Sequence, residues 1–447
     1  MSLDAPRRAA LRAEALRAAR DEGLEVEGRA LPFLSAPLVV ANGAAAGLRG
    51  RLDAFLRALW RLEELCLEEP ACGLRERLAA SLTADGRRLL AQGRESAYSM
   101  RRRFRRLDGF FDPASGGYSV IEVNQAAPIG SHFNDVVQRA ASRLLAELGF
   151  DRPPDLLAPR LLDWLVGEYR QRHGTGRLPR LVVVPIEHGY PAKLADLPRM
   201  AAACEELSAG RYGERIRFRV CFAPELRLRR GRPVLGADEA DLVWRNSGYL
   251  TCYRPEDVAD YVALCSDPAG PVVVNSTRAW LTRTKEVFAI LSGEDAGRTL
   301  GIGPEDLAAI RAVVPLTLNL GRSPERAREV LEDKDAWVSK PADSDFGQGV
   351  EFGANQDDSS WRALVRERSK DGFVFQRRVP CPSAEFPILK EDGSLRLETL
   401  EFDLCPYHVG GAFPGNLISR ANRPAGAGGL RAMNVARGSL IVPVVAA

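Results

Sequence analysis

The sequence predicts an α/β (α+β) protein with a helical N-terminal region, an open α/β layer in the middle and a mixed C-terminal region. Near the N-terminus, Phe55, Leu59 and Leu62 recur at i, i+4 and i+7, which is the spacing of a buried helix face. Between residues 150 and 275 short apolar runs alternate with helical patterns, which is typical of an open α/β layer. A length of 447 residues favours about three domains.

Composition excludes several classes of protein. The 62 Lys and Arg residues nearly balance the 59 Asp and Glu residues, so the chain does not have the basic excess of a nucleic-acid-binding protein. No uncharged apolar run of about 18 residues occurs, so we expect no membrane span. The charged, amphipathic first twenty residues lack the apolar core of a secretory signal, which predicts a cytoplasmic protein. The eight cysteines form no CxxC pair, so reduced thiols are favoured over a zinc site.

Residues 1–105 are predicted to be a helical region. It ends in a run of arginines at positions 101–103, 105 and 106. We expect most of these side chains to form an exposed face, with binding of an anionic substrate by one or two of them as the alternative.

Residues 106–150 are predicted to contain a hairpin that carries acidic groups. Residues 118–123 read as its second strand, after a turn rich in Gly, Ser and Pro. Glu122 and Asn124 are two apart and therefore project from the same face, and Asp108 on the preceding strand can lie beside them. Two carboxylates and an amide oxygen are ligands that suit Mg²⁺. The alternative is an edge hairpin with exposed acids.

Residues 151–278 are predicted to form the open α/β layer, with strands at 181–184, 215–222, 241–246 and 272–275 and helices at 192–207 and 255–265. A hairpin is expected around Arg230-Gly231. Ligands of such layers bind beyond the carboxyl ends of parallel strands, where Arg245 and Asn246 lie. Arg245 suits a bidentate contact with a substrate carboxylate or, alternatively, a surface ion pair. Ser131, which follows the acidic hairpin, is a further substrate candidate, whereas His188 is expected to be a loop histidine rather than a base.

Residues 279–447 are predicted to form the third region, with helices at 284–292 and 304–313 and strands at 337–341, 373–379, 395–404 and 439–445. Lys340 ends one strand and precedes a loop with Gly347, Gln348 and Gly349. Glycine permits close approach of backbone N–H groups to phosphate oxygens, and a lysine supplies a point charge to the same group. The alternative is a plain Gly turn between strands.

Taken in order, these motifs resemble those of the ATP-grasp ligases. The D-x13-E-x-N spacing of Asp108, Glu122 and Asn124 is similar to the metal hairpin of that family. Here the hairpin precedes Lys285 and Lys340, which resembles the circularly permuted branch that includes eukaryotic glutathione synthetase and the synthetase domain of glutathionylspermidine synthase. The resemblance covers about residues 105–445. The chain lacks the amidase domain of the latter enzyme, and it lacks R-E-D after the C-terminal Arg.

The resemblance implies a role for each matched residue. It implies that ATP and Mg²⁺ are bound, with Mg²⁺ on the hairpin triad and the ATP phosphates on the two lysines. It also implies a flexible phosphate loop, an adenine-side strand and an arginine that stabilises the reacting phosphoryl group, with Arg423 as a rival for the last role. The matched residues are Asp108, Glu122 and Asn124 for Mg²⁺; Lys285 and Lys340 for the ATP phosphates; Gly347, Gln348 and Gly349 for the phosphate loop; Gln376 for the adenine-side strand; and Arg420 for the reacting phosphoryl group.

The activity that the resemblance implies is ATP-dependent carboxylate–amine ligation through an acyl phosphate, with release of ADP and phosphate. The expected partners are a small carboxylic acid and an amine, either free, as amino acids, or presented by a carrier protein or peptide. No nucleic acid or membrane partner is expected, and a homodimer is left open. Residues 343–349 and 425–429 are the expected lid. The alternatives are an ATP-grasp phosphotransferase and a nucleotide-binding scaffold without turnover.

Overall fold

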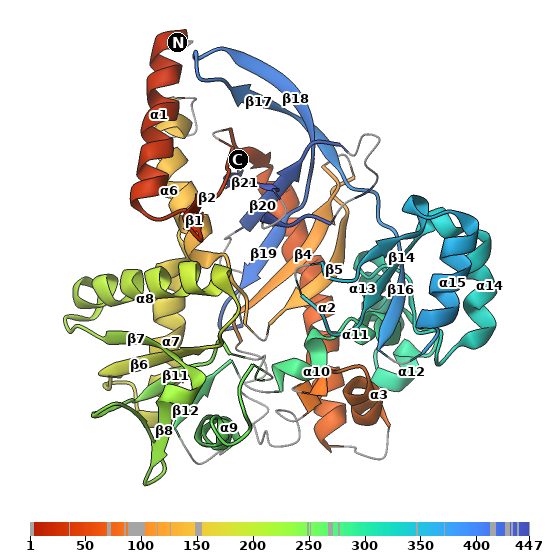
Figure 1. Ribbon diagram of the computed structural model, residues 1–447, viewed down its shortest axis with the longest axis horizontal. Helices are drawn as coiled ribbons and strands as arrows, with labels where there is room; N and C mark the ends of the chain where they lie inside the picture. Colours follow the sequence, from red (N-terminus) through yellow and green to blue (C-terminus); the bar gives the residue numbers. More distant parts are fainter. Residues whose placement is uncertain are drawn as a thin grey trace.

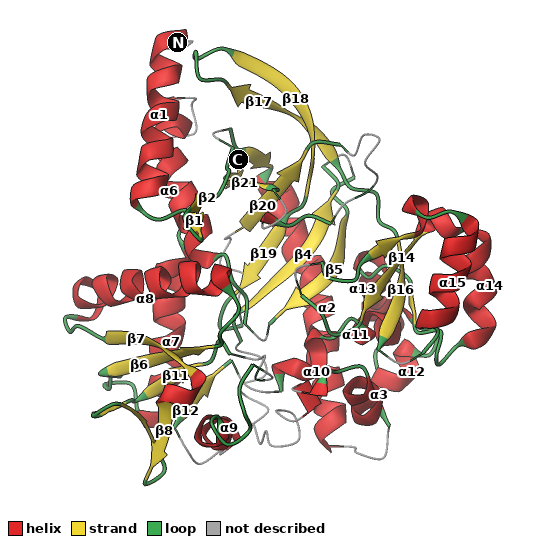
Figure 2. Cartoon of the chain, viewed as in Figure 1, coloured by secondary structure: helices red, strands yellow, loops and turns green. Residues whose placement is uncertain are grey.

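The computed structural model places a seven-stranded sheet between two smaller four-stranded sheets (Figure 1). Figure 2 shows that helices lie against each of the three sheets. The structure describes residues 4–34, 36–68, 73–84, 86–87, 103–113, 115–125, 127–147, 154–247, 250, 252–266, 271–275, 278–345, 347–370, 372–411, 417–424, 430, 432–435 and 438–446.

The central sheet is antiparallel and joins the predicted hairpin to strands from the end of the chain. Its order is β17-β18-β20-β19-β4-β5, with β21 paired to β20. The predicted strand at 439–445 is divided at Pro443 into β21 and β22, and β22 pairs in parallel with β3. The strands are β3 (Leu38–Val40), β4 (Arg105–Phe111), β5 (Tyr118–Asn124), β17 (Ser383–Leu389), β18 (Leu395–Phe402), β19 (Cys405–His408), β20 (Leu417–Asn422), β21 (Leu440–Val442) and β22 (Val444–Ala446).

The N-terminal region is less uniformly helical than predicted. Between its first two helices lie the short strands β1 (Glu25–Val26), β2 (Arg29–Ala30) and β3, because a tight turn with Glu27 at φ 52° and Gly28 at φ 72° reverses the chain. The helices are α1 (Ala5–Asp21), α2 (Asn42–Glu68) and α3 (Leu74–Ala80).

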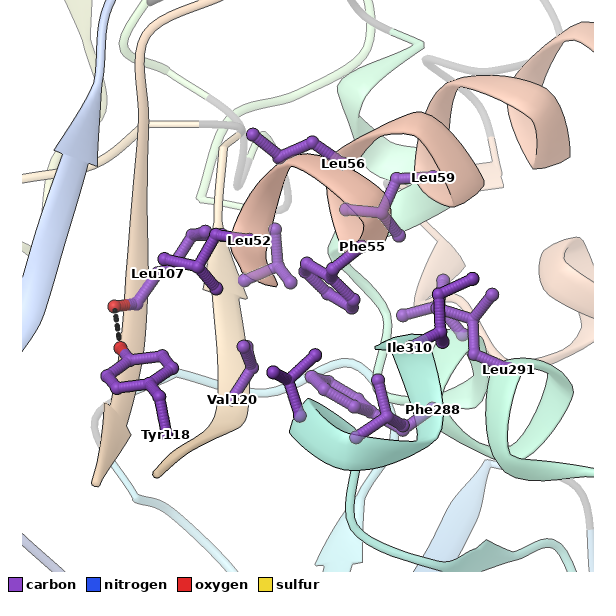
Figure 3. Close-up of a cluster of buried hydrophobic side chains, with 14 of the residues drawn as sticks. Leu52, Phe55, Leu56, Leu59, Leu107, Tyr118, Val120, Phe288, Leu291 and Ile310 are labelled. Carbon is purple, nitrogen blue, oxygen red and sulfur yellow. Dashed lines mark hydrogen bonds between the residues drawn. The ribbon is translucent and has the colours of Figure 1, made fainter. Parts of the chain in front are cut away.

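The predicted apolar face of α2 is buried as expected. Phe55, Leu59 and Leu62 are each 0% exposed. Figure 3 shows Phe55 and Leu59 facing Phe288 and Ile310, so α2 joins the hairpin to the helices of the third region.

The prediction of an exposed arginine face was wrong for Arg103 and Arg105, which are buried. Arg103 forms a salt bridge with Glu63 at 2.7 Å, and Nε of Arg105 donates to Oε1 of Gln125 at 2.7 Å. These partners come from α2 and from the end of β5, so the local sequence could not reveal them. Positions 101 and 102 lie outside the described residues.

The middle region is an open parallel sheet, as predicted. Its strand order is β12-β11-β6-β7. The expected hairpin turns at Arg230 and Gly231, whose φ angles are 51° and 76°. Positive φ at both central residues is what a two-residue hairpin turn of this kind requires. The elements are α6 (Ser131–Glu147), α7 (Leu157–His173), β6 (Leu181–Ile186), α8 (Pro191–Tyr212), β7 (Arg217–Phe222), β8 (Leu226–Arg229), β9 (Arg232–Leu235), β10 (Asp238–Glu239), β11 (Leu242–Trp244), α9 (Ala259–Ser266) and β12 (Val272–Val274).

The third region contains an antiparallel sheet of order β13-β16-β14-β15. The predicted helix at 304–313 and strand at 337–341 are confirmed with the same bounds. No helix in the described part of the chain is long and apolar enough to cross a membrane. The elements are α10 (Ala279–Arg283), α11 (Glu286–Ser292), α12 (Ala296–Leu300), α13 (Pro304–Val313), β13 (Thr317–Leu318), α14 (Ala327–Glu332), β14 (Trp337–Pro341), β15 (Glu351–Phe352), α15 (Asp358–Arg368) and β16 (Phe373–Arg377).

Candidate functional site

A cavity of about 430 Å³ lies where the three sheets meet. Seven cationic side chains and four carboxylates line it, an excess of positive charge that suits an anionic ligand. The predicted site residues that line the cavity are Asp108, Glu122, Asn124, Lys285, Lys340, Gly347, Gln376 and Arg420. The fold therefore brings together residues that lie more than 300 positions apart in the chain.

The β4–β5 hairpin supplies one wall of the cavity in the predicted register. Asp108 lies opposite Glu122, and Arg106 lies opposite Asn124. A bulge between Asp108 and Gly109 ends this stretch of regular pairing. All four side chains line the cavity, because alternate residues of paired strands share a face.

Asp108 is held by two guanidinium groups. Its carboxylate accepts from Nε of Arg106 at 2.7 Å and from a terminal nitrogen of Arg420 at 2.8 Å. Arg420 also forms a salt bridge with Asp403 at 2.6 Å. Burial opposes ionisation of Asp108, but the two guanidinium groups outweigh it and lower its pKa to about 2. Asp108 therefore stays ionised and anchors Arg420 at the cavity.

Four further side chains of the lining form what we call the phosphate wall: Glu122, Lys285, Lys340 and Gln376. The ammonium group of Lys285 lies 2.8 Å from Glu122 and donates to the carbonyl of Ser344 at 2.8 Å. Lys340 donates to Oε1 of Gln376 at 2.6 Å. Burial and the nearby charge of Lys285 lower the pKa of Lys340 to about 8, against the opposing effect of Glu122.

The glycine loop extends the phosphate wall. Gly347 and Gly349 have φ angles of 66° and 68°. This is a backbone conformation that strongly favours glycine. Gly347 lines the cavity, whereas Gln348 and Gly349 continue the loop away from the lining. The second lid candidate, 425–429, lies outside the described residues.

Leu430, which follows the second lid candidate, is bonded to Asn355, which lies just after β15. The N–H of Leu430 donates to Oδ1 of Asn355 at 2.9 Å, and Nδ2 of Asn355 donates to the carbonyl of Leu430 at 2.9 Å. Leu430 lines the cavity itself. The side chain of Asn355 thus holds the lining residue Leu430 by two hydrogen bonds, a contact that we call the Asn355–Leu430 latch.

Glu122 and Asn124 fit a Mg²⁺ ion that is shared with phosphate oxygens. The side chain of Glu122 is 26% exposed, and Nδ2 of Asn124 is buried in the cavity wall without a partner. This amide group is a donor, so a phosphate oxygen would satisfy it, whereas Mg²⁺ would need the amide oxygen of the same side chain. Mg²⁺ sites in proteins use one or two such side chains and complete the shell with phosphate and water. Asp108 instead has its oxygens bonded to arginines. The described residues contain no cluster of three or more His, Cys, Asp or Glu side chains placed to hold a metal.

The structure separates the two C-terminal arginine candidates. The side chain of Arg420 is 13% exposed and lines the cavity. The side chain of Arg423 is 76% exposed and pairs with Glu398 at 3.0 Å.

The predicted substrate residues Arg245, Asn246 and Ser131 do not line the cavity. Arg245 is 0% exposed and bonds to main-chain carbonyls of Ser247 and Asn275, so it forms no surface ion pair. Ser131 is buried at the start of α6, where its hydroxyl donates to Asp196 at 3.4 Å.

His188 lies beyond the end of β6 as an exposed side chain. Its ring stacks on Phe222 with 3.6 Å between centroids. The backbone N–H of His188 donates to the hydroxyl of Tyr253 at 3.0 Å. These contacts fit the expected loop histidine.

A buried polar group lies at the carboxyl ends of β6 and β11, where ligand-binding residues were expected. We call it the strand-end cluster: Glu187, Lys193, Asn246 and Ser247. Sequence reasoning missed its lysine, Lys193. Lys193 lines the cavity, and its ammonium group bonds to Glu187 at 2.5 Å and to the carbonyl of Asn246 at 2.9 Å. Oε2 of Glu187, Oδ1 of Asn246 and the hydroxyl of Ser247 are buried without partners.

The strand-end cluster lies where the strand order of the middle sheet reverses, because β6 has β7 on one side and β11 on the other. Such a switch point is the usual ligand position in open α/β sheets. The helical pattern after β6 was the available signal for Lys193. Arg106 was missed as a cavity residue because it belongs to a run that was interpreted as exposed.

No protein-family model matches the sequence, and no curated protein matches it. Among solved structures, the chain is similar to a glutathione synthetase-like effector from Globodera pallida in its apo form, with a TM-score of 0.65 and 13% identity. That match covers 99% of this chain and 98% of the effector. A weaker match to D-alanyl-alanine synthetase A from Vibrio cholerae O1 biovar eltor str. N16961 has a TM-score of 0.26 and 11% identity, and covers 50% of this chain and 66% of the synthetase. The chain therefore has an α/β fold similar to that of the glutathione synthetase-like effector.

Proposed function

We propose that the protein is a circularly permuted ATP-grasp enzyme that joins a carboxylic acid to an amine at the expense of ATP. In the proposed reaction the carboxylate takes the γ-phosphoryl group and releases ADP. The amine then attacks the acyl carbon, releasing phosphate and a proton and leaving an amide. The observation that carries the proposal is the single cavity that collects Lys285, Lys340, Glu122, Asn124 and Arg420. The hairpin precedes both lysines in the chain, as in the permuted branch.

The phosphate wall supports binding of the triphosphate. Lys285 and Lys340 provide two ammonium groups on one side of the cavity, and the N–H groups of the glycine loop can face the same oxygens. When bound beside Glu122 and Asn124, Mg²⁺ would neutralise phosphate charge and orient the transferred group. Gln376 lies on β16. Just beyond this strand, the apolar residues Val379 and Pro380 line the cavity, and an apolar lining suits a purine.

Arg420 and its two carboxylate partners support charge stabilisation during transfer. Asp108 and Asp403 hold Arg420 in place, so its guanidinium does not have to reorganise as phosphoryl charge develops. The Asn355–Leu430 latch supports exclusion of water, which an acyl phosphate requires.

The strand-end cluster supports binding of an amine-bearing substrate. Its unpartnered atoms on Glu187 and Asn246 are acceptors, and an ammonium or amine group supplies the donors that they lack. Lys193 connects this cluster to the cavity. The proposed substrates are accordingly a small acid and an amine, with an amino acid or peptide as one or both.

The test combines a binding assay with a turnover assay. In a thermal-melting assay, Mg²⁺ and a non-hydrolysable ATP analogue, present at 100 times its dissociation constant, are expected to stabilise the wild type by about 2.7 kcal/mol. The shift is expected to shrink in Lys340→Ala and in Glu122→Gln, and to persist in the exposed-site controls Lys370→Ala and Glu206→Gln. ADP release is then screened over pairs of acids and amines.

Each outcome bears on the proposal. Amide formation with ADP release, lost in Glu122→Gln, supports a ligase. A stable phosphorylated product identifies the phosphotransferase alternative. A Mg²⁺-dependent thermal shift without any ADP release over the whole screen favours the scaffold. The structural argument for a scaffold is that Asp108, an expected Mg²⁺ ligand, is bonded to two arginines. No shift in the wild type, beside an ATP-binding control protein that shifts, contradicts the nucleotide site itself.

A further inference from the structure

The β17–β18 hairpin projects from the central sheet toward the start of α1 (Figure 1). Its turn is fixed there, because Nε of Arg8 donates to the carbonyl of Gly393 at 2.9 Å. Over residues 383–389 and 395–401, β18 pairs with β17 on one side. On its other side it pairs with β20 through Glu401 and Phe402 alone. Among the residues that the structure describes, none pairs with the other side of residues 395–400 of β18, which form a free sheet edge there.

The main-chain groups at this edge can be assigned from the hydrogen bonds at its ends. The backbone N–H of Lys390 donates to the carbonyl of Ser394, and the backbone N–H of Phe402 donates to the carbonyl of Pro382. The main-chain polar groups of even-numbered residues of β18 therefore face β17. The backbone N–H of Asp403 donates to the carbonyl of Arg420 in β20, so the main-chain polar groups of odd-numbered residues face away from β17. Because both polar groups of a residue in an antiparallel strand point the same way, those of Leu395, Leu397 and Thr399 point out of the sheet.

The side chains at this edge are unusually apolar for an unpaired strand. Leu395 is 50% exposed and Leu397 is 62% exposed, and they are two of the five exposed large hydrophobic residues in the described chain. Free edges are normally protected by charges, prolines or a covering element. Arg396 is exposed, and within the described residues it forms no ion pair.

The geometry points to a second copy of this chain as the occupant of this edge: we propose that β18 pairs antiparallel with β18 of another molecule, centred on Leu397. In this register Leu397 meets the same residue of the partner across a two-fold axis, and Leu395 meets Thr399. Both are pairs of outward-facing residues, so each supplies the donors and acceptors that the other lacks.

In the same register, Arg396 of one copy lies opposite Glu398 of the other, and the symmetry repeats the contact. Glu398 also pairs with Lys390 at 2.9 Å and with Arg423 at 3.0 Å in its own chain, so Arg396 would be a third cation near the same carboxylate. These are the non-hydrogen-bonded positions of the ladder, where opposite side chains approach most closely. A shift by one residue would place even-numbered residues, whose polar groups already serve β17, at the bonding positions. The sequence Leu395-Arg396-Leu397-Glu398-Thr399 is thus self-complementary in one register.

Sedimentation velocity of the full chain over a concentration series tests the proposal. A strand pair alone buries less surface than the about 1,200 Å² of stable complexes, so we expect a concentration-dependent dimer. Leu397→Lys is expected to weaken dimerisation about tenfold or more, because two ammonium groups then face each other at the axis. The matched control is Leu207→Lys, an exposed leucine on α8 (39% exposed), which is expected to dimerise like the wild type. Equal melting temperatures show that the variants are folded.

Cross-linking tests the register independently. Opposite residues at a hydrogen-bonded position have Cα atoms about 5.5 Å apart, within the range of a disulfide. Leu397→Cys is therefore expected to form a covalent dimer under mild oxidation, whereas Thr399→Cys, which faces Leu395 of the partner, is expected not to exceed the wild-type background.

Three results would overturn the proposal. They are a monomer at every concentration, a dimer that survives Leu397→Lys, and equal cross-linking of the two cysteine variants. A monomer that instead binds an extended peptide at this edge would assign the edge to another partner.

Discussion

Three buried lysines line the same cavity, and the surroundings of two of them, Lys193 and Lys340, differ most. Lys193, 4% exposed, bonds to the carboxylate of Glu187 in the strand-end cluster. Lys340, 8% exposed, bonds to the neutral amide of Gln376 in the phosphate wall. Within the described part of the chain no salt bridge reaches Lys340. One ammonium group is thus neutralised by its own protein, and the other is left for an anionic ligand.

This difference separates a lysine that maintains the fold from a lysine that awaits a ligand. A buried charge without a counter-ion destabilises the folded state, so it is retained where it performs a function. The comparison yields opposite expectations for the same substitution at the two positions.

The largest expected effect is that of Lys193→Met on stability. The substitution leaves Glu187 buried without its counter-ion, and breaking a buried pair in this way costs about 3–5 kcal/mol. Urea unfolding monitored by circular dichroism measures it, with Lys370→Met as the exposed control. A loss below about 1 kcal/mol would mean that Lys193 is not integral to the fold.

Arg245→Ala is expected to follow at about 3 kcal/mol, because two buried carbonyls lose their donor. The nucleotide-induced thermal shift is expected to survive in the folded fraction. Arg229→Ala, an exposed position of the same region, serves as the control. Unchanged stability with impaired use of the acid substrate would instead restore a substrate-binding role for Arg245.

Lys340→Met sharpens the contrast in the other direction. We expect its stability to be equal to that of the wild type or higher, because a buried charge is removed. We expect its affinity for the ATP analogue to fall by about 2 kcal/mol, the order of one charged hydrogen bond. Calorimetric titration measures the affinity. A destabilised variant that binds the analogue normally would reverse the assignment of the two lysines.

The pH dependence follows from the pKa of Lys340, which is about 8 in the folded protein against an ordinary value of 10.5. The unfolded chain binds the proton of Lys340 more tightly than the folded protein does. The cost of burying the ammonium group therefore falls as the pH rises from 8 toward 10.5, and the free energy of unfolding increases. Phosphate binding needs the protonated lysine, so affinity is expected to weaken several-fold between about pH 7.5 and 9. Lys340→Arg should flatten this dependence, because arginine remains charged. An equally steep profile in that variant would assign the titration to another group.

The smallest expected effect is that of the latch. Asn355→Ala removes two exposed hydrogen bonds to Leu430, with a change in stability of about 1 kcal/mol or less. If the latch excludes water, the ratio of ADP released to amide formed is expected to rise above the wild-type value. An unchanged ratio would leave the latch without a role in catalysis.

The sequence predicted the parts of the site in which local pattern determines direction. Glu122 and Asn124 are two apart on a strand, so their common face followed from strand periodicity, and the cross-strand position of Asp108 followed from the turn. Lys340 was predictable because it ends an apolar strand and precedes glycines.

What the sequence could not predict depends on partners that are distant in the chain. The burial of Arg103 rests on Glu63, 40 positions away, and that of Arg245 rests on the carbonyl of Asn275. The strand-end position of Asn246 was predicted, but its contact with Lys193 requires knowledge of the strand order, because β6 and β11 are neighbours in space but lie about 60 positions apart in the sequence.

Hydrogen–deuterium exchange with and without Mg²⁺ and the ATP analogue tests the central claim most directly. The account predicts slower exchange in the glycine loop and in residues 430–435, and unchanged exchange at residues 187–193 until an amine substrate is added. No protection of the glycine loop, or protection confined to residues 187–193, would contradict the nucleotide site.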